Sequence, residues 1–595
     1  MHHNKNNKQM EKFNINDLKQ TIKNLLKCSK PFIIPLVIAI ILSILASICS
    51  IIGPNKVQDL TNIIVKGILT GINMEKVKNI FITLVIIYTL SLVFNYLQSV
   101  ISTIVTNKIS NRLRNDISKK INKLPLKYFD NTEYGDILSI VVNDVSTLSN
   151  SLSDCVSVFF SSIVLFIGSI IMMFVTNYIM AITAIVSTLI GFVIMAIIIF
   201  KSQKYFLKQQ KHLGELNGCI EETYSSHNII NVYNAKEEVN KKFDDINEKL
   251  TDNARKSSFL SGLMPQVMNF IGNFSYVCIC VVGASLVINK TIDIGVIVAF
   301  MIYTRLFTSP LVNMAQVASE LQSATAAGLR VFKFLDEEEM EEEQGKKLLL
   351  PSKVKGNINF EHVSFAYDEK PIIKDFNASI KKGQKVAIVG PTGAGKTTIV
   401  NLLMKFYKIN KGKITIDGID INDLTRENVH DLFVMVLQDT WSFNGTIYEN
   451  IVYNNKNVSN EEVERVCNIV GLDHYIKTLS NGYNTMLKDS DTLSQGEKQL
   501  LTIARGMLKD SPFLILDEAT SNVDTRTEEL VQKAMDKLTK GKTSFIIAHR
   551  LSTIKNADLI LVLKNGNIIE QGTHEELLKK KGFYEELYNS QFEEV

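Results

Sequence analysis

The stretch KVAIVGPTGAGKTTIVNLLMKFY, residues 385–407, decides the fold of the C-terminal half of this chain. It begins as a short apolar run typical of a buried strand and continues through a loop with the spacing G-x-x-x-x-G-K-T into a helical pattern. The glycines allow backbone N–H groups to turn inward around phosphate groups, and the following helix N-terminus adds the positive end of its dipole. The sequence therefore predicts an α/β domain whose loop at 390–398 binds the phosphates of a nucleotide.

The loop residues have specific expected roles. We expect Lys396 to reach the β- and γ-phosphates of ATP and the hydroxyl of Thr397 to bind Mg²⁺. The full set of loop residues expected to contact ATP is Gly390, Pro391, Thr392, Gly393, Ala394, Gly395, Lys396, Thr397 and Thr398.

A pair of carboxylates follows a second apolar run, FLILDE at 513–518. This run predicts a short buried strand that ends in Asp517 and Glu518. A carboxylate at a strand end beside a phosphate loop is well placed for Mg²⁺, directly or through water. Glu518 can then polarise the water that attacks ATP. Acidic residues commonly end strands, so the motif is informative only because the phosphate loop precedes it.

The N-terminal half contains apolar stretches long enough to cross a membrane. A hydrocarbon core of about 30 Å requires about 20 apolar residues in a helix. Stretches this long and almost without charge disfavour buried helices of a soluble protein. The sixth stretch is the weakest because it contains Arg305. The six predicted spans are 31–53, 80–106, 156–175, 178–200, 260–288 and 294–317.

The distribution of lysine and arginine predicts the orientation of these spans. The segments before 31, at 107–155 and at 201–259 are rich in basic residues, although the loop at 54–79 also carries four lysines. We therefore expect the N-terminus and the C-terminal half to be cytoplasmic in a multi-pass protein of the cell membrane. The two long connections keep helical patterning, so each predicts two helical arms that meet at a tip about 37 Å from the membrane. Breaks in the pattern place the first tip at 125–135 and the second at roughly 224–234.

Composition and pattern together predict the domain organisation. The chain has 595 residues, a net charge of +4 and no separate basic domain, so we expect no nucleic-acid partner. The acidic run DEEEMEEE at 336–343 is expected to be a solvated linker or helix end. The predicted parts are an N-terminal segment (1–30), an all-α six-helix transmembrane domain with long cytoplasmic helical extensions (31–328), an acidic linker (329–350) and an α/β P-loop ATPase domain (351–595).

The segment between the two phosphate motifs carries a family resemblance. DTLSQGEKQLLTIARGML resembles the signature sequence of ABC transporter ATPases. The segments at 124–145 and 214–238 look like the cytoplasmic loops of ABC exporters in which six spans precede one ATPase. The resemblance thus covers nearly the whole chain after residue 30. The signature positions, which in this family meet the partner's ATP, are Leu493, Ser494, Gln495, Gly496 and Glu497.

Further positions match the family's other motifs. By resemblance, Tyr367 stacks on adenine, Gln438 of the Q-loop helps to hold Mg²⁺, and Asp524 belongs to the D-loop. Glu518 is implied as the general base, and His549 as the switch histidine that contacts the γ-phosphate.

The resemblance implies half of a dimeric transporter that exports its substrate by alternating access. ATP would lie between the phosphate loop of one chain and the signature of the other, and its hydrolysis would reset the pair. The signature departs from the common LSGGQ at Gln495 and Glu497, and the added carboxylate could weaken the site completed on the partner. Homodimer and heterodimer both stay open, with a slight preference for the heterodimer.

Two matters are not decided by the sequence. An ATP-gated channel or regulator on the same frame is the alternative function. The substrate could be a drug-like small molecule, a lipid or a peptide, with membrane lipid as a further partner. Arg305 lies in an apolar span, where a central arginine costs about 2.5–3.5 kcal/mol. It would contact an anionic substrate, pair within the protein, or lie near the end of its span.

Overall fold

The computed structural model describes residues 15–343, 345–368, 370–437, 440–455, 458–487, 493–509, 511–517, 525–547 and 554–592. The described residues form two compact units. The first comprises the residues up to Asn122 together with Tyr134–Glu337. The second comprises Lys123–Glu133 together with the residues from Glu338 onward. The first predicted tip, at 125–135, is therefore for the most part assigned to the same compact unit as the predicted ATPase domain.

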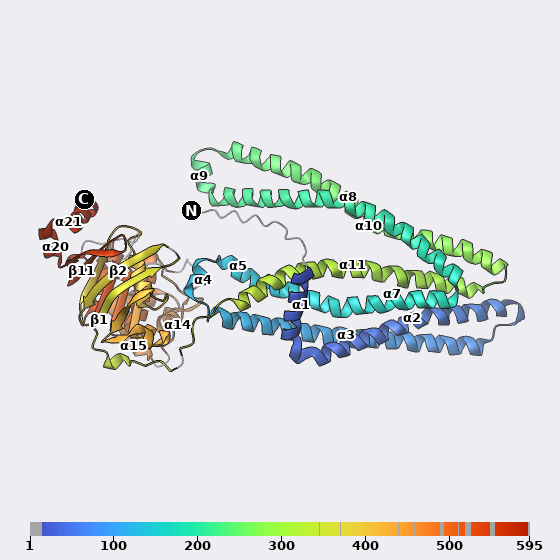
Figure 1. Cartoon of the computed structure of the whole chain (residues 1–595), viewed down its shortest axis with the longest axis horizontal. Coiled ribbons are helices and arrows are strands. Elements are labelled where there is room, and N and C mark those ends of the chain that lie inside the picture. Colours follow the sequence, from blue (N-terminus) through green and yellow to red (C-terminus); the bar gives the residue numbers. More distant parts are fainter. Residues whose placement is uncertain are drawn as a thin grey trace. The chain divides into compact units, whose positions relative to one another are not determined.

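The first unit is entirely helical, and its long helices are visible in Figure 1. Helix α8 packs along α10, α2 along α3, and α11 against both α2 and α7. Two π-helical segments, Ile140–Asp144 and Cys155–Phe159, join the shorter helices into a nearly continuous rod before α7. The helices of this unit are α1 (Ile15–Ser29), α2 (Ile33–Thr70), α3 (Met74–Ile121), α5 (Tyr134–Ser139), α6 (Val145–Asp154), α7 (Phe160–Thr176), α8 (Tyr178–Ser225), α9 (His227–Val232), α10 (Lys236–Ile288) and α11 (Ile294–Asp336).

The six predicted spans are confirmed as six helices that are long and apolar enough to cross a membrane. Each of these helical stretches is longer than its span because it continues beyond the apolar residues, and the third comprises the contiguous helical segments from Tyr134 to Thr176. Helix α3 runs on to Ile121 and α8 to Ser225, so the helical arms predicted for the connections are present. The second tip is the short helix α9. Asparagine side chains at 73 and 177 cap the first turns of α3 and α8, which fixes where these helices begin.

The second unit is built on two main β-sheets. The smaller sheet is antiparallel, with the order β2-β1-β4-β5. The larger has the order β12-β11-β3-β10-β9-β6, and only β12 runs antiparallel to its neighbour. The strands are β1 (Ile358–Ala366), β2 (Pro371–Ile380), β3 (Lys385–Val389), β4 (Lys411–Ile416), β5 (Ile419–Asp420), β6 (Phe433–Val436), β7 (Gly445–Thr446), β8 (Met486–Leu487), β9 (Phe513–Asp517), β10 (Thr543–Ile547), β11 (Leu559–Lys564) and β12 (Asn567–Gly572).

Helices surround the larger sheet and supply much of its hydrophobic core. The predicted strands at 385–390 and 513–518 correspond to β3 and β9, and each is buried along nearly its whole length. The helices of this unit are α4 (Leu126–Asp130), α12 (Lys396–Leu403), α13 (Arg426–Leu432), α14 (Ile447–Val452), α15 (Asn460–Val470), α16 (Asp473–Thr478), α17 (Gln495–Leu508), α18 (Thr525–Thr539), α20 (His574–Lys580) and α21 (Phe583–Phe592).

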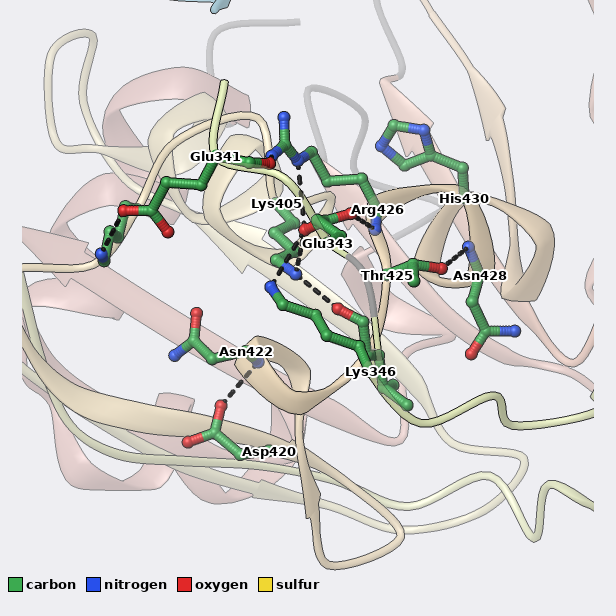
Figure 2. A network of polar contacts seen from close by, with 12 residues as sticks. Glu341, Glu343, Lys346, Lys405, Asp420, Asn422, Thr425, Arg426, Asn428 and His430 are labelled. Atoms are coloured by element: carbon green, nitrogen blue, oxygen red, sulfur yellow. Dashed lines mark hydrogen bonds and ion pairs between the residues drawn. The ribbon is translucent and has the colours of Figure 1, made fainter. Parts of the chain in front are cut away.

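The acidic run begins at the end of α11 and most of its side chains are exposed, as expected for a solvated helix end, but Glu343 is an exception. Helix α11 continues to Asp336, so the first part of the segment 329–350 is helical. Figure 2 shows that Glu343, only 14% exposed, then lies among three basic side chains. Its carboxylate contacts Lys405 at 2.8 Å, Lys346 at 3.1 Å and Arg426 at 3.3 Å. The acidic run therefore anchors the chain to the ATPase unit, because its charges meet cations that lie far away in the sequence.

The protonation of Glu343 reflects this environment. Burial favours the neutral carboxylic acid, but hydrogen bonds from Lys405, the Arg426 backbone and Lys346 outweigh burial and lower the pKa of Glu343 to about 2. Neighbouring residues extend the attachment. Glu341 pairs with Lys408 at 2.9 Å, and Glu339 pairs with Lys123 at 3.2 Å.

Candidate nucleotide-binding site

The loop between β3 and α12 has the backbone shape that a phosphate group requires. Gly390 and Gly395 have φ angles of 155° and 100°, a region that favours glycine. A Cβ atom at Gly390 would lie 2.3 Å from the carbonyl oxygen of Leu563, and one at Gly395 would lie 2.7 Å from the Ile373 side chain. Because side chains would be both strained and crowded here, the two glycines let the loop curl tightly at the start of α12.

Lys396 is the first residue of α12, and its side chain folds back over the loop. Its Nζ donates a hydrogen bond of 2.6 Å to the carbonyl oxygen of Gly390. Burial lowers the pKa of Lys396 from its usual value, and the charge of Asp517 opposes this change. A partly desolvated cation at a helix N-terminus is a strong partner for a phosphate group.

The same loop forms one wall of a pocket of about 300 Å³. Asp517, at the end of β9, also lines this pocket, because β9 and β3 both flank β10 and their carboxyl ends meet at the same edge of the parallel sheet. The pocket thus combines a backbone cradle, a cation, a hydroxyl and a carboxylate, a set that fits a nucleotide phosphate with a divalent cation. The residues that line it are Ile372, Thr392, Gly393, Ala394, Gly395, Lys396, Thr397, Thr398, Asp517 and Ile547.

Tyr367 lies beside this pocket without lining it. Its ring packs edge-to-face against Phe365 and Tyr407, with centroid distances of 4.8 Å in both pairs. Its hydroxyl donates to the Thr398 hydroxyl at 3.4 Å, so the side chain is tied to the first turns of α12. The position next to the phosphate loop suits an adenine platform, and the stacking role itself stays a prediction.

The signature residues lie at the start of helix α17, and none of them lines the phosphate pocket of their own chain. Leu493 and Gly496 are buried, whereas Ser494 and Gln495 are exposed. Ser494 is the N-cap: its hydroxyl accepts from the Glu497 N–H at 3.3 Å, and the Glu497 carboxylate accepts from the Ser494 N–H at 2.7 Å. Glu497 therefore closes a capping box, and its charge lies at the helix N-terminus.

Four predicted site residues lie outside the residues that the structure describes. They are Gln438, Glu518, Asp524 and His549. Their roles in binding Mg²⁺, in activating water and in contacting the γ-phosphate stay predictions. Asp517, the neighbour of Glu518, is described and lines the phosphate pocket as expected.

The structure adds contacts that the sequence analysis did not identify. In the segment Lys123–Glu133, Lys127 donates to the Tyr367 carbonyl oxygen at 3.1 Å and pairs with Asp368 at 3.2 Å. Asp130, at the end of α4, accepts a hydrogen bond from the Tyr407 hydroxyl. The breaks in the helical pattern at 125–135 predicted where the tip lies. The local sequence could not predict which residues the tip contacts, because those residues lie 240 and 277 positions away in the chain.

Comparisons with known proteins agree with this geometry. Residues 36–311 match the model of the ABC transporter transmembrane region, and residues 373–521 match the ABC transporter model. The uncharacterized ABC transporter ATP-binding protein YfiC of Bacillus subtilis is 42% identical over 80% of this chain and 78% of its own length. The chain therefore belongs to the ABC transporter family.

Two relatives have names that mention lipids. A fatty acid ABC transporter ATP-binding/permease protein of Mycobacterium bovis is 42% identical over 78% of this ABC transporter and 74% of its own length. An ATP-dependent lipid A-core flippase of Syntrophus aciditrophicus is 32% identical over 88% of this chain and 87% of its own length.

Family and fold together establish the general activity. This ABC transporter is a multi-pass membrane protein that uses ATP, and its hydrolysis of ATP is coupled to export. One transmembrane region and one ATPase domain in a single chain make it a half-transporter, which works as a dimer and moves a substrate.

Proposed function

We propose that this half-transporter exports an amphipathic lipid across the cell membrane by alternating access, with its N-terminus and ATPase domain in the cytoplasm. The observation that carries the proposal is a phosphate pocket lined by both Lys396 and Asp517, in a chain that also has a six-helix transmembrane domain. The lipid substrate is supported by two relatives whose names specify a fatty acid and lipid A-core.

The proposed chemistry assigns a role to each pocket residue. Lys396 neutralises the β- and γ-phosphates, while the Thr397 hydroxyl and Asp517 hold Mg²⁺ with Gln438. Glu518 takes the proton of the attacking water, and His549 contacts the γ-phosphate. A bound Mg²⁺ would withdraw charge from the phosphate oxygens, which favours attack by water. Thr397 and Asp517 support this assignment because they face the same pocket.

We infer that the contacts of α4 carry the nucleotide state toward the membrane helices. Tyr367 is the predicted adenine platform, and its ring touches Tyr407, whose hydroxyl holds Asp130. Lys127 binds the carbonyl group of Tyr367 itself. A change in the position of Tyr367 when adenine binds would therefore move Lys127 and Asp130 in the segment Lys123–Glu133, which follows α3.

We also infer that each ATP site is completed by the signature residues of the second half-transporter. The exposed Ser494 at the N-terminus of α17 supports this role, because a helix N-terminus with free N–H groups favours a phosphate. The carboxylate of Glu497 lies at the same helix end, and its negative charge opposes the binding of a phosphate. The heterodimer remains slightly preferred, because a partner with a common signature would supply one site without this added charge.

The direct test is transport by purified protein in proteoliposomes. ATP and Mg²⁺ would be added to the external medium of inside-out vesicles. The accumulation inside the vesicles would then be compared for a labelled long-chain fatty acid, a phospholipid, a hydrophobic peptide and a cationic drug. The proposal predicts ATP-dependent accumulation of a lipid. Accumulation of only the drug or only the peptide would show that the substrate is not a lipid. ATP hydrolysis without accumulation of any of the four compounds would contradict export. Preparations with and without a candidate second half-transporter separate homodimer from heterodimer.

A further inference from the structure

Arg305 is the sole charged residue in the six apolar stretches at 31–53, 80–106, 156–175, 178–200, 260–288 and 294–317. It lies eleven residues after Ile294, the first residue of α11, which at 1.5 Å per residue is about 16 Å along the helix. That depth is close to the middle of a hydrocarbon core of about 30 Å. If the hydrocarbon core begins near Ile294, where the predicted span begins, the arginine lies well inside the span.

The side chain of Arg305 points away from the protein core. Its neighbours Tyr303, Thr304 and Phe307 are buried, whereas Arg305 is exposed. Neither an ion pair nor a side-chain hydrogen bond is present for it in the part of the chain that the structure describes. The six stretches contain no aspartate or glutamate that could supply a counter-charge at this depth.

The face of α11 that carries Arg305 is too polar to lie against lipid acyl chains. Within the predicted span its exposed residues recur at helical spacing as Arg305, Ser309, Val312 and Gln316, and the polar stripe continues beyond the span through Ser319 and Ser323. Helices α3 and α8 instead expose runs of isoleucine, leucine, valine and phenylalanine, while α11 exposes only Ile294 and Val312 of its large apolar side chains. A polar stripe on an otherwise apolar span faces a water-filled space, a bound ligand or the second half-transporter rather than lipid tails.

We propose that Arg305 binds the anionic head group of the transported amphiphile, a carboxylate or phosphate, within the membrane. The guanidinium presents a planar fork of donors that matches such a group with two hydrogen bonds. The apolar walls of the neighbouring helices accept the acyl chain. This inference rests on the proposed lipid export and specifies its substrate: the amphiphile must be an anion.

Stimulation of ATP hydrolysis tests the charge preference. The transporter would be reconstituted in nanodiscs of neutral phosphatidylcholine and titrated with palmitate, lysophosphatidic acid, hexadecanol and a hexadecyl ammonium salt. We expect the two anions to stimulate at concentrations about tenfold lower than hexadecanol, which corresponds to about 1.4 kcal/mol. Palmitate and lysophosphatidic acid distinguish a carboxylate from a phosphate ligand. Equal stimulation by palmitate and hexadecanol would overturn the assignment.

Variants connect this preference to the residue. Arg305→Gln should weaken equilibrium binding of radiolabelled palmitate to the ATP-free transporter by about tenfold or more, and Arg305→Lys should restore part of it because the charge remains. Val312→Thr, on the same stripe, is the matched control and should keep wild-type binding. Unchanged palmitate binding in Arg305→Gln would refute the inference, as would loss of equal size in Val312→Thr. Absence of ATP-driven flux of every lipid in the unmodified protein would instead refute the export proposal beneath it.

Discussion

Replacement of Glu497 by glutamine should strengthen the ATP site that this chain completes on its partner. The carboxylate closes the capping box of α17 by accepting from the Ser494 N–H at 2.7 Å. Glutamine can accept the same hydrogen bond, since both residues serve at this position of a capping box. The substitution therefore keeps the helix start and removes one negative charge from beside the predicted γ-phosphate contact.

The expected size follows from Coulomb's law. If the Glu497 carboxylate lies about 7 Å from a γ-phosphate that the Ser494 hydroxyl touches, two unit charges at that distance repel by about 0.6 kcal/mol in water and about 2.4 kcal/mol at an effective dielectric constant of 20. Removing this repulsion should tighten ATP binding by about threefold to sixtyfold. The loss of a favourable carboxylate–dipole interaction should cost stability by only about 0.3–1 kcal/mol.

The assay is the ATP concentration that gives half-maximal hydrolysis by the reconstituted transporter, with thermal unfolding measured in parallel. The chain offers a matched control in Glu576, which closes an equivalent capping box with Thr573 at the start of α20. Glu576→Gln makes the same chemical change at a cap that lacks a signature motif and should leave the ATP requirement unchanged. If Glu497→Gln folds normally and its ATP requirement matches the wild type, the repulsion argument is wrong.

Three other substitutions test the site and its attachments. Lys396→Ala should weaken ATP binding by about ten- to hundredfold, measured with a fluorescent ATP analogue, because a charge-assisted contact contributes about 1.5–3 kcal/mol; near-normal binding would remove Lys396 from the site. Tyr407→Phe keeps the ring against Tyr367 but loses the bond to the Asp130 carboxylate, so lipid moved per ATP should fall about tenfold or more. Tyr448→Phe loses only a weak bond to the Val458 carbonyl and should not change the lipid moved per ATP. Glu343→Gln should lower the unfolding temperature at pH 7, because the folded pKa of about 2 lies below the ordinary value of 4.5. The stabilisation by Glu343 is then complete above about pH 4.5 and lost as pH falls toward 2, so an equal deficit at pH 7 and pH 2.5 would contradict the ion-pair account.

Local patterns predicted the parts of the molecule whose physics is local. A run of apolar residues followed by glycines specifies β3 and its phosphate loop, because burial and backbone freedom are properties of those residues themselves. The six spans follow in the same way from length and lack of charge. The S-x-x-E spacing of Ser494 and Glu497 also carried the signal of a capping box, which the comparison with the family signature overlooked.

Contacts between distant segments were not predictable from one sequence. A run of glutamates predicts exposed side chains, because the sequence does not show which cations lie near it in the fold. Lys405 and Arg426 come close to Glu343 only in the folded ATPase unit. The assignment of Lys123–Glu133 to the ATPase unit depends likewise on Asp368 and Tyr407. For Arg305 the charge and the apolar span could be predicted from the sequence, but only the structure shows that its face of α11 is exposed.

The central claim is that ATP hydrolysis at this site drives vectorial movement of a lipid. The most direct measurement is lipid flux and phosphate release in the same proteoliposomes, compared between the wild type and Glu518→Gln. We predict that the wild type accumulates lipid in proportion to the ATP hydrolysed. The variant should bind ATP with near-normal affinity, hydrolyse it at least about a hundredfold more slowly and sustain no accumulation. Sustained flux through Glu518→Gln with ATP bound and unhydrolysed would contradict the account and favour an ATP-gated channel.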